Sequence, residues 1–408
     1  MEDRFGPYTV YECLGAGGMA TVHRASIELE DDELREVALK RLLPQLASDK
    51  RFIDDFIREG KLAAELQHPN IVRILELGRI GRTYFIAMDL VRGRSLMALM
   101  RKAYQKRLPA PIGVVVFLMR ELCDALEHAH DAQIVHRDLT PSNLIVTEEG
   151  HLKIIDFGVA KALVGNLQTS SGLSKGKLGY MSMEAIGGKK LDTRADIFSA
   201  GVVMWELIST RRLFKGSNEI EIINKIRDAE VQPPSVYNRD CPADLDDIVL
   251  KALERSKEER WSAAGDMRDV LGELCALYGE DASAEAVVAW MADLRGHTVP
   301  SRLESDGEST LVRMEPEEPE IELIDDDLAL GSQRGDAFSG SFGAGASDRP
   351  YGDVPDEGQL AVGSDVATYD DTVDTVDDPD GATAAEGRGS RKFKEVDTIV
   401  STFPPRKS

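Results

Sequence analysis

A short segment near the middle of the chain places an acid and an amide at a spacing that could do chemistry. Residues 136–144 read HRDLTPSNL, so Asp138 stands five residues before Asn143. An aspartate can accept a proton from an incoming hydroxyl group, and an asparagine can offer its amide oxygen to a cation. Residues 156–158 read DFG after a predicted strand, and Asp156 can bind Mg²⁺ there. These two segments predict a proton acceptor beside a magnesium site.

A glycine-rich turn near the N-terminus adds a possible phosphate site. Residues 14–22 read LGAGGMATV and lie between two predicted strands. Glycines let the backbone approach a phosphate closely and offer it N–H donors. The turn opens no helix and does not end in GK[ST], which disfavours a dinucleotide-binding turn and an NTPase P-loop. By itself the pattern is equally compatible with an ordinary hairpin.

Two charged residues complete an ordered set of five features. Lys40 ends VALK (37–40) on the next predicted strand, where it could pair with phosphate oxygens. Glu59, on a predicted helix, could hold Lys40 through an ion pair, and Glu65 is the alternative. Each of these charges alone is more often a solvated surface group. Together and in this order, the five features indicate a site for a magnesium-bound phosphate compound.

The elements that must position these residues fall into two groups. Residues 8–43 alternate and turn like strands, 49–67 have helical spacing, and IVRILELG (71–78) and TYFIAMDLV (83–91) predict two further strands. A small hairpin is expected around Glu149 and Gly150. Helices are predicted at 95–106, 112–132, 193–210, 218–228, 243–254 and 263–278. A sheet-rich first third before a helix-rich remainder predicts a two-lobed α+β protein.

The ordered set resembles the protein kinases, and most closely the bacterial eukaryotic-like (Hanks-type) serine/threonine kinases. The resemblance covers residues 8–278. Further matches are HPNIV at 68–72, YMSME at 180–184 and DIFSAGVVMWEL at 196–207, whose aspartate anchors the catalytic loop in the family. Arg260 matches the arginine that pairs with the glutamate at the position of Glu184. The resemblance implies a small β-rich N-lobe, a larger helical C-lobe, ATP and Mg²⁺ as cofactors, and protein substrates.

The resemblance also implies a role for each matching residue. Asp138 would orient and deprotonate the substrate hydroxyl, and Lys40, held by Glu59, would pair with the α- and β-phosphates. Asn143 and Asp156 would hold the Mg²⁺ ions that neutralise charge on the transferred phosphoryl group. The expected nucleotide-binding positions are Leu14, Gly15, Ala16, Gly17, Gly18, Met19, Ala20, Thr21, Val22, Lys40, Asp89 and Val91, with Met88 gating the adenine pocket.

Thr140 departs from the family pattern. Serine/threonine kinases of this kind usually have a lysine two residues after the catalytic aspartate, where it neutralises the γ-phosphate, and a threonine before YMSPE that touches this lysine. This chain has Thr140 and Lys177 at those two positions. We predict an exchange in which Lys177 supplies the ammonium group and Thr140 the hydroxyl group to the catalytic site. Unrelated drift with weakened catalysis is the alternative. Two smaller departures are Ala20 for the third loop glycine and Met183 for the usual proline.

The segment after DFG predicts regulation by phosphorylation. It contains several hydroxyl side chains before YMSME, namely Thr169, Ser170, Ser171 and Ser174. Arg137, which precedes the catalytic aspartate, could bind a phosphate on this segment. We therefore expect autophosphorylation there, first at Thr169 and Ser171.

Charge is distributed unevenly along the chain. The formal net charge of −23 argues against nucleic acid or an anionic membrane as partner. Residues 301–408 hold 26 acidic and 10 basic residues. Residues 279–297 predict an accessory helix packed on the kinase-like body. The range 298–408 is expected to be a disordered acidic tail, because its scattered apolar residues cannot offset the entropy of ordering.

Other features bear on location and partners. No apolar run long enough for a membrane span, no secretory signal and no metal-binding cysteine spacing occur, so the expected location is the cytoplasm. Threonines in acidic settings at 308–310, 371–376 and 396–400 are candidate docking points for phosphothreonine-reading partners, with a solubilising spacer as the alternative.

Three rival functions stay open at this stage. A pseudokinase that binds nucleotide and acts as a scaffold is favoured only by Thr140 and Met183. A small-molecule kinase is disfavoured by YMSME and Arg260, which resemble protein-substrate machinery. Tyrosine specificity is not excluded by motif, because the catalytic-loop lysine is missing.

Overall fold

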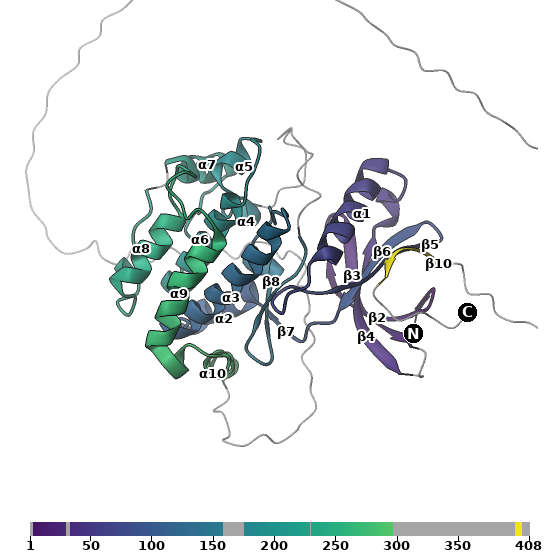
Figure 1. The fold of residues 1–408 in the computed structure, drawn as a ribbon, viewed down its shortest axis with the longest axis horizontal. Helices are drawn as coiled ribbons and strands as arrows, with labels where there is room; N and C mark the ends of the chain where they lie inside the picture. The colour runs from purple at the N-terminus through teal and green to yellow at the C-terminus, as the bar shows by residue number, and fades with distance from the viewer. Residues whose placement is uncertain (1–2, 30–32, 158–174, 229, 297–395, 402–408) are drawn as a thin grey trace, which may run out of the picture. The chain divides into compact units, whose positions relative to one another are not determined.

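The computed structural model describes residues 3–29, 33–157, 175–228, 230–296 and 396–401 (Figure 1). Its first lobe is built on a seven-stranded sheet in the order β1-β2-β3-β4-β6-β5-β10, in which all neighbours are antiparallel. The strands are β1 (Asp3–Phe5), β2 (Tyr8–Ala16), β3 (Ala20–Glu28), β4 (Leu34–Leu42), β5 (Ile74–Ile80), β6 (Thr83–Asp89) and β10 (Val396–Ser401).

Both faces of this sheet are apolar, and the alternation along β4 decides where Lys40 lies. Val37 and Leu39 belong to the apolar cluster on one face, whereas Ala38 and Leu42 belong to the cluster on the face toward the helix α1. Successive side chains of a strand point to opposite faces. Lys40 therefore shares its face with Ala38 and Leu42, and this face carries the site.

Helix α1 (Lys50–Glu65) packs against this sheet. The Asp49 side chain caps its N-terminus by accepting a hydrogen bond from the backbone N–H of Arg51 at 3.0 Å. Phe56 and Ala63 are buried on the face toward the sheet. A Cβ at Gly60 would lie 3.0 Å from Leu77 Cδ1, so this glycine allows the helix to lie close to β5. That close packing fixes the position of the neighbouring residue Glu59.

The second lobe is mainly helical. Its elements are α2 (Leu96–Lys106), α3 (Ile112–Asp131), α4 (Lys175–Leu178), α5 (Met183–Ile186), α6 (Arg194–Ser209), α7 (Glu219–Asp228), α8 (Ala243–Ala252), α9 (Ala264–Tyr278), α10 (Ala284–Arg295) and a small sheet of β7 (Gly93–Ser95), β8 (Leu144–Thr147) and β9 (Leu152–Ile154). The two-lobed α+β arrangement predicted from the sequence is confirmed.

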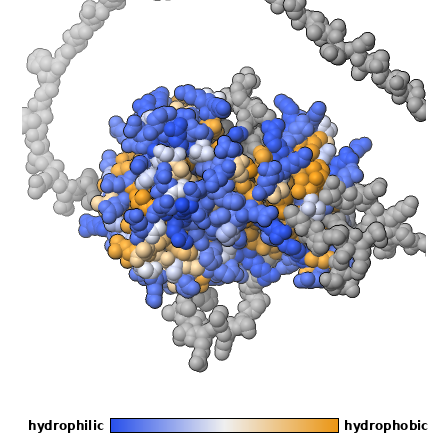
Figure 2. Space-filling view, viewed as in Figure 1, coloured by the Kyte–Doolittle hydropathy of each residue, from blue (hydrophilic) through white to orange (hydrophobic). Residues whose placement is uncertain are grey.

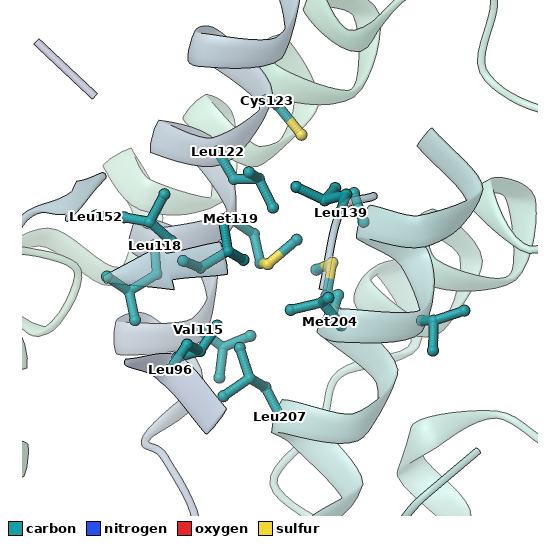
Figure 3. Close-up of a cluster of buried hydrophobic side chains, with 14 of the residues drawn as sticks. Leu96, Val115, Leu118, Met119, Leu122, Cys123, Leu139, Leu152, Met204 and Leu207 are labelled. Carbon is teal, nitrogen blue, oxygen red and sulfur yellow. The ribbon is translucent and has the colours of Figure 1, made fainter. Parts of the chain in front are cut away.

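The core of this lobe lies between α3 and α6. Both helices are apolar on nearly all sides and almost wholly buried, as expected of helices in the interior of a domain. Figure 3 shows Met119 and Leu122 of α3 facing Met204 of α6 across this core, with Leu139 of the HRD segment beside them. Because Leu139 is 1% exposed, the residue that follows Asp138 is anchored in the core.

Helix α10 occupies the stretch in which an accessory helix was expected. Its N-terminus is capped by Ser283, whose side chain accepts a hydrogen bond from the N–H of Ala286. Val287, Met291 and Leu294 are buried in the same apolar cluster as α3. Contacts with α2 and α3 join this helix to the second lobe.

One described segment of the C-terminal range differs from its expectation. Residues 298–408 were expected to be disordered, but Val396–Ser401 form the strand β10, so the expectation is wrong for this segment. The rest of that range lies outside the described residues. Within the described part of the chain, no helix is both long and apolar enough to cross a membrane. Hydrophilic residues cover most of the face seen in Figure 2.

Candidate active site

A lysine with only 12% of its side chain exposed joins three elements at the centre of the site. Lys40 Nζ lies 2.7 Å from Glu59 Oε1 on α1 and 2.9 Å from Asp156 Oδ1 of the DFG segment. Burial by itself lowers the pKa of Lys40, but the carboxylates of Asp156 and Glu59 outweigh burial and raise the pKa above its ordinary value. Lys40 is therefore a cation at neutral pH. The partner on α1 is Glu59, and not Glu65, which is exposed.

A buried aspartate of α6 holds the backbone of the HRD segment (136–138). Asp196 accepts hydrogen bonds from the backbone N–H of His136 at 2.7 Å and of Arg137 at 2.9 Å, and from His130 Nε2 at 2.9 Å. Burial by itself would raise the pKa of Asp196, but the hydrogen bond from His130 and the other donors lower the pKa below its ordinary value. The carboxylate is thus ionised and fixes the loop, as the resemblance implied for this aspartate.

The backbone adopts an uncommon conformation at two residues, one in this loop and one in the DFG segment. Arg137 has a φ of 67° and Asp156 a φ of 56°, in the left-handed region that residues other than glycine rarely adopt. The bonds to Asp196 hold Arg137 there. Phe157 is 2% exposed, and its ring centre lies 4.8 Å from that of His136, which holds the DFG segment against the catalytic loop. Such conformations persist only where surrounding contacts enforce them.

Asn143 links Asp138 to the segment that carries Asp156. It ends the 3₁₀ turn Pro141–Asn143, and its Nδ2 donates to the Asp138 carbonyl oxygen at 2.7 Å and to Asp138 Oδ2 at 3.3 Å. The backbone N–H of Ile155 donates to the Asn143 carbonyl at 2.9 Å, which places Asp156 beside this turn. Because Nδ2 binds Asp138, the amide oxygen is left as a metal ligand. One carboxylate and one amide oxygen fit Mg²⁺, which takes few protein ligands beside substrate phosphates.

Thr140 and Lys177, for which we predicted an exchange of roles, line the same pocket. Lys177, on α4, places Nζ 3.5 Å from Asp138 Oδ2 although the two residues are 39 positions apart. Thr140 and Lys177 both line the pocket next to Asp138. Thr140 is 3% exposed, and its Oγ1 has no hydrogen-bond partner among the described residues. The structure thus places the Lys177 ammonium group next to the Asp138 carboxylate.

An apolar pocket lies between the glycine-rich strands and the small sheet. Its walls are formed by side chains of both lobes, namely Leu14, Val22, Ala38, Val72, Met88, Asp89, Leu90, Val91, Ile145, Ile155 and Asp156. Most of these side chains are apolar, and Asp156, which also lines the pocket, binds Lys40. The Asp89 carboxylate accepts a hydrogen bond from Arg35 Nη2 at 2.8 Å. The backbone N–H of Asp89 donates to the Arg73 carbonyl oxygen at 3.0 Å. These bonds hold the segment between the lobes beside the pocket.

The glycine-rich turn connects β2 and β3 above this pocket. The Gly17 N–H donates to the Ala20 carbonyl at 2.9 Å and closes the turn. A Cβ at Gly18 would meet no atom within 4 Å, so packing within the protein does not require glycine there. Close approach of a bound phosphate supplies a reason for the glycine. The turn between Ala16 and Ala20 therefore stays a predicted phosphate site.

A second buried ion pair supports the segment that faces the substrate. Arg260 donates to Glu184 through Nη1 at 2.6 Å and Nη2 at 3.2 Å, and the two side chains are 1% and 10% exposed. Burial by itself would raise the pKa of Glu184, but the hydrogen bonds from Arg260 lower the pKa below its ordinary value. The pair expected from the resemblance is present, and Met183 in place of proline leaves it intact.

The sequence analysis missed a neighbouring network. Tyr180 Oη donates to Glu206 Oε2 at 2.7 Å, and Arg212 binds both residues. Arg212 Nη2 also donates to the Gly176 carbonyl at 3.2 Å, directly before Lys177. Glu206 lies within the stretch 196–207 that carries the resemblance, but its partners follow no periodic spacing. This network fixes the chain on both sides of Lys177.

The predicted phosphorylation sites cannot be compared with the structure. Thr169, Ser170, Ser171 and Ser174 lie outside the described residues. Arg137, the residue expected to bind a phosphate there, is described, and its buried Nε has no hydrogen-bond partner within the described ranges.

Comparisons with known proteins agree with this geometry. A sequence model described as "Protein kinase domain" matches residues 8–270. The chain is 36% identical over 301 residues to the tyrosine-protein kinase MasK of Myxococcus xanthus, which covers 72% of this chain and 46% of the relative. It is 34% identical over 262 residues to the serine/threonine-protein kinase PrkC of Bacillus subtilis, which covers 64% of this chain and 39% of the relative. The chain thus spans less than half of the length of these curated relatives.

A solved structure gives the same result. The kinase domain of PknI from Mycobacterium tuberculosis has a TM-score of 0.51 and 27% sequence identity, covering 67% of this chain and 97% of that domain. These matches confirm the resemblance to bacterial eukaryotic-like kinases. Since the family's sequence model spans well over half of the chain, the protein belongs to the protein kinase family.

Proposed function

We propose that the protein is an ATP- and Mg²⁺-dependent kinase that transfers the γ-phosphoryl group to serine and threonine hydroxyls of proteins. The observation that carries this proposal is the assembled site, in which Lys40 binds Glu59 and Asp156 at once while Asn143 binds Asp138. A pseudokinase scaffold would not need all five of these residues in place. Of the relatives compared above, PrkC is named a serine/threonine-protein kinase, which supports this acceptor class.

The residues divide the work of phosphoryl transfer among themselves. Asp138 orients the substrate hydroxyl and accepts its proton as the oxygen bonds to the γ-phosphorus and the bond to the β-phosphate oxygen breaks. Lys40 holds the nucleotide phosphates, and Glu59 holds Lys40. Asn143 and Asp156 would bind Mg²⁺, which supplies positive charge to the phosphates. The transition state is loose, so positioning and electrostatics supply most of the catalysis.

Loss of the catalytic carboxylate tests this function. Asp138→Asn should lower ATP-dependent phosphorylation of protein substrates by about 10²–10⁴-fold, because the proton acceptor is lost. Asp131→Asn is the matched control, since Asp131 is an exposed aspartate at the end of α3 and should leave activity unchanged. Phosphorylation that persists in Asp138→Asn would refute the proposed mechanism, and ATP binding without phosphorylation in the wild type would favour the scaffold.

The acceptor residue needs its own measurement. One relative is named a tyrosine-protein kinase, and Thr140 stands where serine/threonine kinases usually have lysine. Phosphoamino-acid analysis of labelled substrate and of the kinase itself should give phosphoserine and phosphothreonine. Phosphotyrosine as the main product would overturn the proposed specificity and leave the kinase activity standing.

We also propose that Lys177 replaces the missing lysine of the catalytic loop and that Thr140 replaces the threonine of the activation segment. The 3.5 Å separation of Lys177 Nζ from Asp138 Oδ2 supports this exchange. An ammonium group at this distance can move to a γ-phosphate that enters beside Asp138. Because Lys177 lies on α4, neutralisation of the γ-phosphate would require the segment before YMSME to be well ordered.

Two variants test the exchange. Lys177→Ala should lower kcat by about 10- to 100-fold with a smaller change in the KM for ATP, since the ammonium group acts most strongly in the transition state. Lys190→Ala, an exposed lysine on the same lobe, is the control and should be silent. The double change Thr140→Lys with Lys177→Thr should restore part of the loss. Full activity in Lys177→Ala would end the proposal.

Autophosphorylation of the activation segment is the proposed means of control. The backbone of Arg137 is held by Asp196, and its buried Nε has no hydrogen-bond partner among the described residues. A phosphate on either residue would add about −1.5 to −2 charge that Arg137 can bind. Tandem mass spectrometry after incubation with ATP should find phosphate within 169–174. An active sample with this segment unmodified would contradict the proposal.

The tail threonines are proposed docking points for phosphothreonine-reading partners, and a solubilising spacer is the competing interpretation. The groups at 308–310 and 371–376 lie outside the described residues, whereas 396–400 falls in β10. Capture of a phosphothreonine-binding domain by the ATP-treated chain, but not by Asp138→Asn, would support the docking role.

A further inference from the structure

The edge of the N-lobe sheet is covered by a segment from the far end of the chain. β10 (Val396–Ser401) runs antiparallel to β5 and extends the sheet beyond β5 (Figure 1). The register pairs Val396 with Ile80, Thr398 with Gly78 and Ser401 with Glu76, with an irregularity between Thr398 and Val400. An uncovered edge strand offers a row of N–H and C=O groups to any extended segment. β5 is therefore a strand-binding surface, and the chain itself provides a strand.

Side chains add specificity to this backbone pairing. Asp397 Oδ2 accepts from Arg79 Nε at 3.1 Å and from Arg79 Nη2 at 2.5 Å, directly across the two strands. Ile399 and Val400 are half-buried and pack against the apolar cluster on the α1 face of the sheet. The Arg79–Asp397 ion pair and these two aliphatic side chains together fix which residues of the tail face β5.

The sequence of the segment suits this role better than its surroundings do. VDTIVS contains three β-branched aliphatic residues and a threonine, all favoured in strands. The tail before it is dominated by acidic and small residues, which favour no strand. Two prolines at 404 and 405 follow, and proline disfavours continuation of a paired strand.

The docked segment shares its apolar layer with the helix that carries Glu59. Val400 lies opposite Leu77 of β5. Leu77 belongs to the same cluster as Phe56 of α1, and its Cδ1 would lie 3.0 Å from a Cβ at Gly60. β10 thus adds to the apolar layer on which α1 rests. Gly60, which contacts Leu77 in this layer, is the residue next to Glu59. In this arrangement the Lys40–Glu59 ion pair is formed.

We propose that the edge of β5 is a docking site for residues 396–401 of the same chain, and that docking stabilises α1 in the position that pairs Glu59 with Lys40. The segment is thus an activating strand at the β5 edge of the N-lobe sheet. Phosphoryl transfer depends on it through α1, and release of the strand lowers activity while leaving Asp138 and its neighbours untouched. The effect on activity rests on the kinase function proposed above, whereas docking itself does not.

Hydrogen exchange in the full chain tests docking without any assay of activity. Ile399→Asp with Val400→Asp should expose the backbone amides of β5 to exchange, because burying two carboxylates in the apolar layer is unfavourable. Val373→Asp with Val376→Asp is the matched control, since these valines lie in the similar tail sequence TVDTV and should leave β5 protected. Unchanged exchange of β5 in the first double variant would overturn the proposal.

A charge exchange tests the register. Arg79→Asp and Asp397→Arg should each raise the exchange rate of β5 amides, because each places like charges opposite one another. The combined variant should return the rate toward that of the wild type. Failure of the combined variant to recover would show that Asp397 does not face Arg79, and it would overturn the proposed pairing.

Kinetics and dilution test the two remaining parts. Ile399→Asp with Val400→Asp should lower kcat/KM by about fivefold or more, the low end of usual couplings between sites, and a peptide of residues 394–403 added in excess should recover it. Unchanged kcat/KM with exposed β5 amides would remove the activating role. Protection of β5 should not vary over a hundredfold range of protein concentration, and protection that rises with concentration would assign the strand to a second copy.

Discussion

The two lobes each contain a buried ion pair between distant residues, and the two pairs are built differently. Lys40 presents a single ammonium group to Glu59 and Asp156, which belong to separate elements. Arg260 binds Glu184 with two parallel hydrogen bonds. Arg260 also donates to backbone carbonyl oxygens, at 2.8 Å in the nearest case, that of Glu254. Lys40 can therefore exchange one partner for another, whereas the N–H groups of Arg260 are already used in hydrogen bonds.

This difference follows from the chemistry of the two side chains. An ammonium group is a point charge on a flexible stem, and it can move from a carboxylate to a phosphate with little change in geometry. A guanidinium group has a rigid fork that matches one carboxylate and loses most of its bonds if it moves. The N-lobe pair is therefore suited to catalysis and control, and the C-lobe pair to holding the fold. Removal of either cation should separate these roles.

Loss of the C-lobe cation should have the largest effect. Arg260→Ala should lower the free energy of unfolding by about 3–5 kcal/mol, because Glu184 would stay buried without its partner. Urea or thermal unfolding measures this change. Arg255→Ala is the control, because Arg255 is exposed and its removal should change stability by about 0.5 kcal/mol or less. A stable Arg260→Ala protein would show that Glu184 finds another partner or water.

Loss of the N-lobe cation should affect catalysis more than folding. Lys40→Met should lower kcat/KM by about 100-fold or more, equal to about 2.7 kcal/mol, because a donor to the nucleotide phosphates is removed. The unfolding midpoint should change less than in Arg260→Ala. Lys61→Met, an exposed lysine on the same helix α1, is the control and should keep full activity. Equal losses of stability in the Lys40 and Arg260 variants would remove the contrast between the pairs.

The residues of both pairs could be predicted from the sequence, because motifs mark them. Most strand and helix ranges and the choice of Lys40 and Asp156 followed from local pattern and spacing. The sequence did not decide whether Glu59 or Glu65 pairs with Lys40. The structure shows that the partner is Glu59, on the part of α1 where Gly60 lets the helix pack closely on β5.

Other features could not be predicted because no local pattern encodes them. β10 was missed since its partner Arg79 lies 318 residues before Asp397, and six strand-like residues within an acidic tail give no signal of pairing. The bonds of Arg212 to Tyr180 and Gly176 likewise join separate loops. Such contacts are decided by tertiary packing, which periodicity does not report.

Reciprocal conservative changes sharpen the contrast at a smaller scale. Arg260→Lys should lower the free energy of unfolding by about 1.5 kcal/mol and spare kcat, because one of the two parallel bonds to Glu184 is lost. Lys40→Arg should lower kcat and spare the unfolding midpoint, because a rigid fork replaces the exchangeable point charge. Steady-state kinetics and urea unfolding on the same two samples give both quantities. Identical behaviour of the two variants would show that lysine and arginine are interchangeable at both positions.

The pH dependence of stability should show the smallest and most selective effect. The pKa of Glu184 is lowered in the folded protein, so its stabilising contribution is complete above the ordinary glutamate pKa of about 4.3 and is lost as the pH falls below it. The pKa of Lys40 is raised, so its contribution is complete below the ordinary lysine pKa of about 10.4 and is lost only as the pH rises above that value. Acid therefore weakens the C-lobe pair through Glu184 and leaves Lys40 charged.

Urea unfolding of the wild type and Glu184→Gln at about pH 7, 5, 4 and 3 measures this effect. Glu184→Gln keeps the shape of the side chain but has no charge to lose, so its midpoint should fall less steeply with acid than that of the wild type. The gap between the two proteins should therefore be widest near neutral pH and should narrow below about pH 4.3. Glu273→Gln, at an exposed position, is the control, and its unfolding midpoint should differ from that of the wild type by the same amount at every pH. A gap that widens in acid would mean that Arg260 stabilises the protonated carboxyl, opposite to the direction argued for Glu184.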